Sequence, residues 1–567
     1  MASVTAQTEP QPVLWPARPS ARRPWIIPAL LLAFYAGQCL WFVGTQSFTF
    51  DEPVHLFTGI RAWQGRFDMW NDHPPLARML FAAPLLRHGL DLAYTGISPG
   101  PMSVRGMRSD PVGVAWRTRP LNVALGVLLG VLLWLAARRL FCEAAANFAL
   151  ALFAFSPGMI AHFSVATTDG IGILTIFATA CQLMRWRRQP SRRNTALLGA
   201  VLAALLLAKF YTLPIFLLAL VLVLVLRGER VALRPRDWNW RPAMAAAAIA
   251  VFLVSGVYSF HLTRLRFRDG VMSAFIPGRE TPIVTPVAVP GSFSLLAPAG
   301  EYGDGLRYVE AHNITGHAAY LLGHISRSGL PSYWPIVIAL KWPVIVLLLF
   351  AGALVLLAAR RIPLTRDLLL LGIFPLVMVA MLPFSHIQIG DRHPLTIYPF
   401  LLLLVAGVWW ASDPHLPEPG RCGAPWGRWL KAALIALVLL QAADTLRVAP
   451  DYLSYFNFWV RPGQAYKLVS DSNLDWGQGL IALRDWQARH PEQPLHVAYF
   501  GTMDPKLYGV RARLLLPGER ATGAIAVSMT AMTGQYLDDP NAYKWLLKYP
   551  HQVVNHSIFI VHVPADR

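Results

Sequence analysis

The chain has 567 residues, of which 55% are hydrophobic and 14% are charged. This composition excludes an ordinary soluble protein, in which about 25% of residues are charged. The formal net charge of +19 would suggest nucleic-acid binding in a soluble chain. In a membrane protein, however, Lys and Arg gather in cytoplasmic segments. We therefore expect a chain that crosses the bilayer many times and binds no nucleic acid.

Apolar runs long enough to cross a bilayer recur throughout residues 25–447. They predict an α-helical polytopic membrane protein with about eleven transmembrane helices. The predicted spans are 25–47, 120–137, 145–163, 170–184, two short spans within 195–226, then 242–260, 334–358, 368–383, 395–411 and 430–447. Residues 1–24 are polar and rich in proline, and we expect them to form a cytoplasmic tail.

The distribution of charge predicts the orientation of the chain. Lys and Arg outnumber Asp and Glu in the segments at one end of the predicted spans, and such segments face the cytoplasm. The amino terminus is then inside and the carboxyl terminus outside. Under this topology two large loops, 48–119 and 261–333, lie outside the cytoplasm.

From about residue 448 the composition changes to that of a soluble fold. The runs LHVAYFG (495–501) and AIAVSM (524–529) are typical of strands, whereas LIALRDWQARH (480–490) has the apolar spacing of a helix. The sequence therefore predicts a small extracytoplasmic α/β domain over residues 448–567.

Two consecutive carboxylates, Asp51 and Glu52, directly follow the first predicted span. Ionised side chains at the edge of a low-dielectric region are rare and costly, although both residues could simply be solvated at a helix end. Other polar residues are expected on the same outer side: His55, Asp72, His73, Asp169, His312, His317, Asp391, Arg392 and His393. Their concentration on one side indicates a single site at the membrane surface.

These residue types suit transfer to a hydroxyl from a phosphate-linked donor. A carboxylate can act as general base toward an acceptor hydroxyl. Arg392, with Lys209 or His393, can neutralise a phosphate, since Arg presents a bidentate fork to it. Each histidine could instead be an interfacial side chain with satisfied hydrogen bonds. The TTD triplet at 167–169 could likewise be a helix cap, for which Thr and Asp are both suited.

A divalent metal is a further possibility in the segment NDHPPL (71–76). Pro74 and Pro75 stiffen the backbone and fix where Asp72 and His73 point. Asp72 with His312 is chemically able to bind a metal, but two ligands from distant loops are fewer than a typical protein metal site uses. We expect no required cofactor.

Several motifs together resemble the GT-C membrane glycosyltransferases. They are the acidic pair after the first span, NDHPPL, TTD, HNITGHAAYLLGHIS (312–326), IGDRHPLTIYP (389–399), YLSYFNFW (452–459) and SDSNLDWGQGL (470–480). The combination is most similar to the protein O-mannosyltransferase-like group, glycosyltransferase family 39, which is related to the lipid A aminoarabinose transferases. The resemblance covers most of the chain. It implies a GT-C fold and an enzyme that moves a sugar from a polyprenyl-phosphate carrier to an acceptor hydroxyl outside the cytoplasm.

The resemblance also implies roles for individual residues. Asp51 corresponds to the catalytic carboxylate, with Glu52 beside it and Asp169 as a second acidic residue. Arg392 and His393 are expected near the donor phosphate. The remaining expected roles are donor-phosphate binding for His73 and Lys209, acceptor or sugar binding for His55 and His317, and metal binding for Asp72 and His312. His73 stands where the aminoarabinose transferases carry a lysine.

Two other functions fit a polytopic chain. A transporter or flippase of a lipid-linked sugar would place charged residues near the middle of the membrane and show repeated spans, and neither feature is evident. A non-catalytic scaffold whose outer domain binds a partner would give the outer polar residues no reason to cluster. Under the enzymatic hypothesis the partners are the lipid-linked donor, the bilayer, and an acceptor protein, lipid or glycan.

Overall fold

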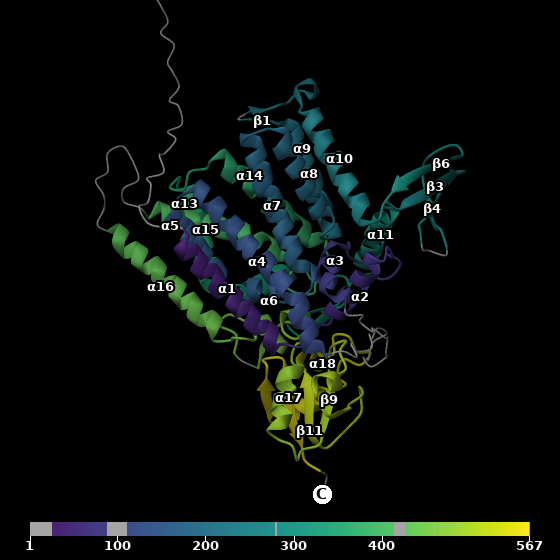
Figure 1. Ribbon diagram of the computed structural model, residues 1–567. Helices are drawn as coiled ribbons and strands as arrows, with labels where there is room; N and C mark the ends of the chain where they lie inside the picture. Colours follow the sequence, from purple (N-terminus) through teal and green to yellow (C-terminus); the bar gives the residue numbers. More distant parts are fainter. Residues whose placement is uncertain are drawn as a thin grey trace, which may run out of the picture.

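The computed structural model describes residues 25–87, 110–228, 230–277, 281–412, 426–461 and 463–565. The predicted cytoplasmic tail, residues 1–24, lies outside the described residues. Helices form a bundle, and a β-sheet packs against one end of it (Figure 1). We call that end of the bundle, next to the five-stranded sheet, the sheet end.

Each predicted span coincides with a helix or with two consecutive helices. These helices are α1 (Ile26–Thr45), α4 (Pro111–Leu140), α5 (Glu143–Ala154), α6 (Pro157–Phe163), α7 (Thr168–Arg188), α8 (Arg192–Leu206), α9 (Leu213–Val225), α10 (Trp240–Val257), α12 (Tyr333–Lys341), α13 (Val344–Ala358), α14 (Arg366–Met381), α15 (Tyr398–Ala411) and α16 (Trp426–Leu446). A two-stranded hairpin, β1 (Leu226–Arg227) and β2 (Arg230–Val231), joins α9 to α10 at the end opposite the sheet end (Figure 1).

The predicted number of eleven spans is not confirmed. Among the described residues, 6 helices are long and apolar enough to cross a membrane, or up to 8 if each of two bent pairs is one span. The shortfall arises in part because α8 and α9 have only 15 and 13 residues. The structure therefore shows a multi-pass chain with several spans that are short or bent.

Proline accounts for the two bent pairs. Pro157 begins α6 and Pro343 immediately precedes α13. Proline has no N–H to donate, so the backbone ladder is interrupted at each position. Helices α5 and α6 are bent by 66°, and α12 and α13 by 114°. The first bend matters for the site, because α6 carries His162.

The two large loops have more regular structure than the sequence suggested. The first contains α2 (Glu52–Trp63) and α3 (Leu76–Ala82). The second contains a four-stranded antiparallel sheet of order β5-β4-β3-β6, a helix and a short hairpin. These elements are β3 (Leu262–Arg268), β4 (Val271–Phe275), β5 (Ile283–Pro286), β6 (Phe293–Pro298), α11 (Gly300–Thr315), β7 (Ala319–Leu321) and β8 (His324–Ser326).

The carboxyl-terminal region holds a five-stranded mixed sheet of order β10-β9-β11-β13-β12. Its elements are α17 (Leu480–Ala488), β9 (Leu495–Ala498), β10 (Ala512–Leu514), β11 (Gly523–Ser528), α18 (Met529–Thr533), β12 (His551–Val554) and β13 (Ile558–Val563). Strand β9 pairs in parallel with β10 and β11, and β13 pairs antiparallel with β11 and β12.

The predicted boundary at residue 448 is not a clean division between bundle and sheet. The chain just after α1 bonds to the segment that precedes α17: Ser47 N donates to Gln478 O at 3.0 Å, and Phe50 N donates to Trp476 O at 2.8 Å. The sheet region is thus tied to the bundle at the place where Asp51 and Glu52 lie. An independent domain over 448–567 stays a prediction.

Candidate active site

Asp51 lies where the chain leaves α1 and enters α2, of which it is the N-cap residue. Its side chain is 29% exposed. Burial raises the pKa of Asp51, and the neighbouring Arg392 opposes that rise. Arg392 Nη1 donates to Asp51 Oδ2 at 3.0 Å. The outcome is a half-buried carboxylate that is more basic than a free aspartate.

Arg392 lies between two carboxylates. Besides Asp51, its Nη1 is 3.8 Å from Asp169 Oδ2, and its guanidinium carbon lies 4.6 Å from the centre of the Trp476 ring. Lys209, which precedes α9, donates from Nζ to Asp169 Oδ1. Two cations and two carboxylates therefore converge from four distant parts of the chain at the sheet end.

His162 is a residue of this cluster that sequence reasoning missed. Its ring lies between two buried carboxylates, with Nδ1 3.8 Å from Asp169 Oδ2 and Nε2 3.8 Å from Asp391 Oδ1. Within the described part of the chain, His162 Nδ1, Asp391 Oδ2 and Arg392 Nε are buried without a hydrogen-bond partner. The signal was available, because His162 begins the run HFSVATTD that ends at Asp169.

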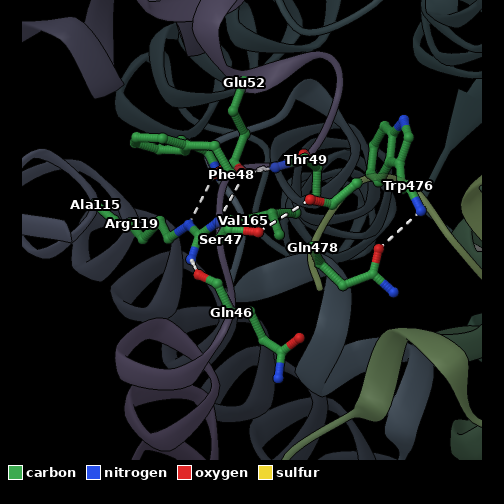
Figure 2. Close-up of polar contacts among 12 residues, drawn as sticks. Gln46, Ser47, Phe48, Thr49, Glu52, Ala115, Arg119, Val165, Trp476 and Gln478 are labelled. Atoms are coloured by element: carbon green, nitrogen blue, oxygen red, sulfur yellow. Dashed lines mark hydrogen bonds and ion pairs between the residues drawn. The ribbon is translucent and has the colours of Figure 1, made fainter. Parts of the chain in front are cut away.

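Glu52 has different surroundings from Asp51, and Figure 2 shows those of Glu52. It is fully buried, and Arg119 binds it twice, from Nε to Oε1 at 2.9 Å and from Nη2 to Oε2 at 2.8 Å. Backbone N–H groups of Thr49 and Ala166 complete the set, at 2.8 Å and 2.7 Å. Every lone-pair direction of the carboxylate is thus occupied by protein, which leaves no oxygen free for an acceptor.

Arg119 holds the turn that presents Asp51. It is fully buried on α4 and also donates to the carbonyl oxygens of Gln46 and Ser47, at 2.7 Å and 2.8 Å. These contacts join α4, the end of α1 and the start of α2 through one guanidinium (Figure 2). A catalytic role for Glu52 stays a prediction. From these contacts we propose a positioning role for Glu52, because its carboxylate is bonded to the turn that presents Asp51.

Asp72, His73 and His55 form a neighbouring cluster around Arg78. Arg78 Nη2 donates to Asp72 Oδ1 at 2.5 Å, Arg78 Nε donates to His55 Nδ1 at 3.2 Å, and His73 Nδ1 lies 3.0 Å from Asp72 Oδ2. Although burial raises the pKa of Asp72, Arg78 and His73 outweigh that effect and lower it well below its usual value. Burial and then Arg78 lower the pKa of His55, so this imidazole is neutral at pH 7.

His312 and His317 connect the cluster to the carboxyl-terminal region. His312 Nε2 lies 3.1 Å from His317 Nδ1, and His317 Nε2 lies 3.0 Å from the hydroxyl of Tyr536. Tyr536 in turn donates to Asp471. Burial lowers the pKa of His317 to about 4, so it is neutral near pH 7.

The two residues of the predicted metal pair have different hydrogen-bond partners. Asp72 is bonded to Arg78 and His73, while His312 is bonded to His317. Among the described residues, no group of three or more His, Cys, Asp or Glu side chains is placed to hold a metal ion. Metal binding by Asp72 and His312 therefore stays a prediction.

His393 follows Arg392 and lies against aromatic rings. Its ring centre is 5.6 Å from that of Trp334 and 6.0 Å from that of Tyr211. Burial, with Lys209 and Arg392 nearby, lowers the pKa of His393 well below its ordinary value. The structure therefore brings Asp51, Asp169, Lys209, Arg392 and His393 into one cluster, in which the carboxylate of Asp51 is partly exposed and two cations lie beside it.

One family model and three solved structures are similar to this chain. Residues 113–260 match the family model described as dolichyl-phosphate-mannose-protein mannosyltransferase. The solved structure of the S. cerevisiae protein O-mannosyltransferase Pmt1–Pmt2 complex bound to the sugar donor is 12% identical, with a TM-score of 0.50, and the match covers 76% of this chain and 91% of that one.

Two further structures are of ArnT from Cupriavidus metallidurans. The form bound to undecaprenyl phosphate is 14% identical with a TM-score of 0.45, and the match covers 96% of this chain and 99% of that one. The apo form is 15% identical with a TM-score of 0.44, over 96% and 98% of the two chains. A comparison with curated protein sequences gave no match.

Proposed function

We propose that this membrane glycosyltransferase, which resembles the GT-C, protein O-mannosyltransferase-like enzymes in sequence and fold, transfers a sugar from a polyprenyl-phosphate donor to an acceptor hydroxyl. The matched family model and the shared fold support the predicted resemblance. The acceptor is a protein, a lipid or a glycan. The exposure of the site carboxylates and the position of the two cations support a phosphate-linked donor and a base-assisted mechanism.

The observation that carries the mechanism is the difference in exposure among four neighbouring carboxylates. The Asp51 side chain is 29% exposed, whereas Glu52, Asp169 and Asp391 are exposed by 2% or less. A general base must reach the proton that it removes. Asp51 is therefore the group that takes the proton of the acceptor hydroxyl.

The bond changes form a direct displacement at the anomeric carbon. As Asp51 removes the proton, the acceptor oxygen attacks the anomeric carbon, and the bond from that carbon to the phosphate oxygen breaks. The polyprenyl phosphate leaves with the bonding electron pair, and the anomeric configuration is inverted. Because the phosphate is already a good leaving group, no general acid is needed.

Arg392 and Lys209 are placed to stabilise the charge that develops on the departing phosphate. Arg392 is 8% exposed and Lys209 is 4% exposed, so their charges act in a low-dielectric setting. Asp169 orients Lys209, and the unpartnered Nε of Arg392 is available to a phosphate oxygen. We assign His393 and His73 to the rim of the phosphate site, and His55 and His317 to the acceptor or sugar side.

We also propose that the sheet end faces away from the cytoplasm in a bacterial plasma membrane. Basic residues support this orientation, because the opposite end of the bundle carries Arg187 and Arg188 of α7, together with Arg227 and Arg230 of the β1–β2 hairpin. A cluster of this kind is typical of a cytoplasmic face.

The function is tested by mass analysis of cells that lack the chain. We expect one polyprenyl-phosphate sugar to accumulate and one sugar modification to disappear, and we expect the wild-type gene to restore both. The Asp51→Asn variant should not restore them, whereas Asp485→Asn, a matched change at an exposed residue of α17, should. Unchanged lipid-linked sugars and glycans in the deletion strain would contradict the proposal.

A further inference from the structure

The four-stranded sheet β5-β4-β3-β6 has one face that carries both arginine and large apolar side chains. Residues that pair directly across neighbouring strands point to the same face. Arg264 is paired with Phe275 on one side and with Leu296 on the other. Arg268 is paired with Val271. Arg266 is paired with Ser273, which is itself paired with Val284. We call this set the arginine face: Arg264, Arg266, Arg268, Val271, Phe275, Val284 and Leu296.

The arginine face is exposed. Its apolar members Phe275, Val284 and Leu296 are exposed by 39%, 57% and 60%, and its three arginines are exposed as well. Arg268 meets only its exposed neighbour Asp269. Within the described residues, Arg264 and Arg266 have no acidic partner. The face is therefore a net positive surface with large apolar side chains set among the charges.

The opposite face supplies the small core of the sheet. Ala274, Ile276 and Ile283 are buried there, and Leu265 packs against them, while Phe267 and Phe293 stack with ring centres 4.6 Å apart. The sheet thus has its own apolar core on the other side. This opposite face also exposes Phe293 and Leu295, by 44% and 41%. Among the described residues, Phe275 of the arginine face lies 5.6 Å from the guanidinium carbon of Arg266, and Phe275, Val284 and Leu296 belong to no buried apolar cluster.

The position of the sheet indicates what covers the arginine face. Helix α10, a candidate membrane span, ends at Val257, and β3 begins only five residues later, at Leu262. The start of the sheet therefore lies close to the end of a candidate span. The sheet projects sideways from the bundle, away from the five-stranded sheet, beside the half of α10 that leads into β3 (Figure 1). A surface placed there extends over lipid beside the bundle.

We propose that the arginine face lies on the bilayer, where its three arginines bind the phosphates of anionic phospholipid headgroups and its apolar side chains insert among the acyl-chain ends. Arginine forms paired hydrogen bonds with phosphate oxygens. Basic side chains combined with Phe and Leu are typical of elements that lie in the membrane interface. This docking goes beyond the glycosyl transfer and does not depend on it.

Photo-crosslinking in the full-length protein tests the proposal, with two neighbouring residues of β6 as a matched pair. Leu296 belongs to the arginine face, whereas Leu295 pairs with Leu265 on the opposite face. A photoreactive amino acid is placed at either position, and the protein is reconstituted in vesicles with 30% phosphatidylglycerol in phosphatidylcholine. Mass analysis of the peptide that contains β6 then identifies the cross-linked molecule.

We expect phospholipid to be attached at position 296, with a yield at least about fivefold higher than at position 295. Equal yields at the two positions, or attachment of protein instead of lipid at position 296, would overturn the proposal.

A second experiment tests the recognition of charge. The yield at position 296 should fall about tenfold when phosphatidylcholine replaces all of the phosphatidylglycerol, and by a similar factor in the Arg264→Gln/Arg266→Gln/Arg268→Gln variant. The two lipids are compared with the protein that keeps all three arginines. This comparison therefore tests the proposal even if the triple variant does not fold. A yield that is the same in both lipids would overturn headgroup recognition.

Discussion

Asp51 and Glu52 are adjacent in the chain and have opposite surroundings. Glu52 is enclosed by Arg119, Thr49 and Ala166, whereas Asp51 is half-exposed and faces Arg392. The sequence could indicate that the pair belongs to the site, because two carboxylates follow a span directly. It could not separate their roles, since Arg119 lies 67 residues from Glu52 and inside an apolar helix.

The buried Glu52–Arg119 pair predicts a large loss of stability on neutralisation. Glu52→Gln leaves a buried guanidinium without its counter-charge, which costs about 3–5 kcal/mol. The matched change Glu143→Gln breaks only a half-exposed contact with Arg138 at 3.9 Å and should cost less than about 1 kcal/mol. Unfolding temperatures in the same detergent compare the two variants, and equal losses would argue against the positioning role.

Arg392 predicts a shift in the pH dependence of transfer. Burial raises the pKa of Asp51 and Arg392 counteracts that rise, so removing the positive charge raises this pKa further. Protonated Asp51 cannot accept a proton. The acidic limb of the pH profile of kcat/KM should therefore move to higher pH in the Arg392→Gln variant. Arg392→Lys keeps the charge and should shift the limb less. Identical limbs in the wild type and the Gln variant would contradict this coupling.

At the scale of elements, apolar runs located the spans but not the sheets. Each predicted span coincides with helices, since burial in lipid demands long apolar segments whose backbone groups are paired internally. The second loop was predicted only as a large external loop, and it is rich in Pro and Gly. Along its first strand, LTRLRFR (262–268), apolar and basic residues alternate. This period of two is typical of a strand. Strands of only 4 to 7 residues leave too weak a signal to outweigh so many turn residues.

The segment 470–478, which joins the bundle to the five-stranded sheet, predicts a pH-dependent stability. Asp475 is buried and accepts hydrogen bonds from Thr530 N at 3.0 Å and Gly477 N at 3.2 Å. Burial raises its pKa to about 6, above the value of about 3.9 in an unfolded chain. Between these values the folded state holds a proton that the unfolded state has lost, so stability falls as pH rises.

The contribution of Asp475 is about 1.4 kcal/mol per pH unit over that interval. Asp475→Asn cannot ionise and should flatten this part of the stability profile, while losing about 1 kcal/mol at low pH because the amide has only one acceptor oxygen. Denaturation midpoints between pH 4 and 7 compare the variant with the wild type. A slope that is equally steep in both would show that Asp475 does not control it.

For the whole molecule, the sequence motifs indicated the class of enzyme and predicted a single outer site, since most of them lie close to the end of a predicted span. They could not give the contacts that build it. Asp51 and Arg392 are 341 residues apart, and His162 enters the cluster only because α5 and α6 are bent. Such convergence depends on how the helices pack, which no local pattern encodes.

The proposed orientation of the whole molecule predicts at which positions a fused reporter enzyme is active. Alkaline phosphatase, which is active only outside the cytoplasm, should be active when fused after residue 565 and inactive when fused within the β1–β2 hairpin at residue 228. A fluorescent reporter that folds only in the cytoplasm should give the opposite pattern. Activity of the phosphatase at both positions, or only in the hairpin, would refute the orientation.

Transfer by the purified chain tests the central claim most directly. The full-length protein in vesicles is supplied with polyprenyl-phosphate sugars that carry an isotopic label in the sugar, together with an extract of candidate acceptors. We expect the wild type to release polyprenyl phosphate as label enters an acceptor. Asp51→Asn should lower that rate by about 10²–10⁴-fold, with an unchanged unfolding temperature. Full transfer by Asp51→Asn, or no release of polyprenyl phosphate by the wild type, would contradict the account.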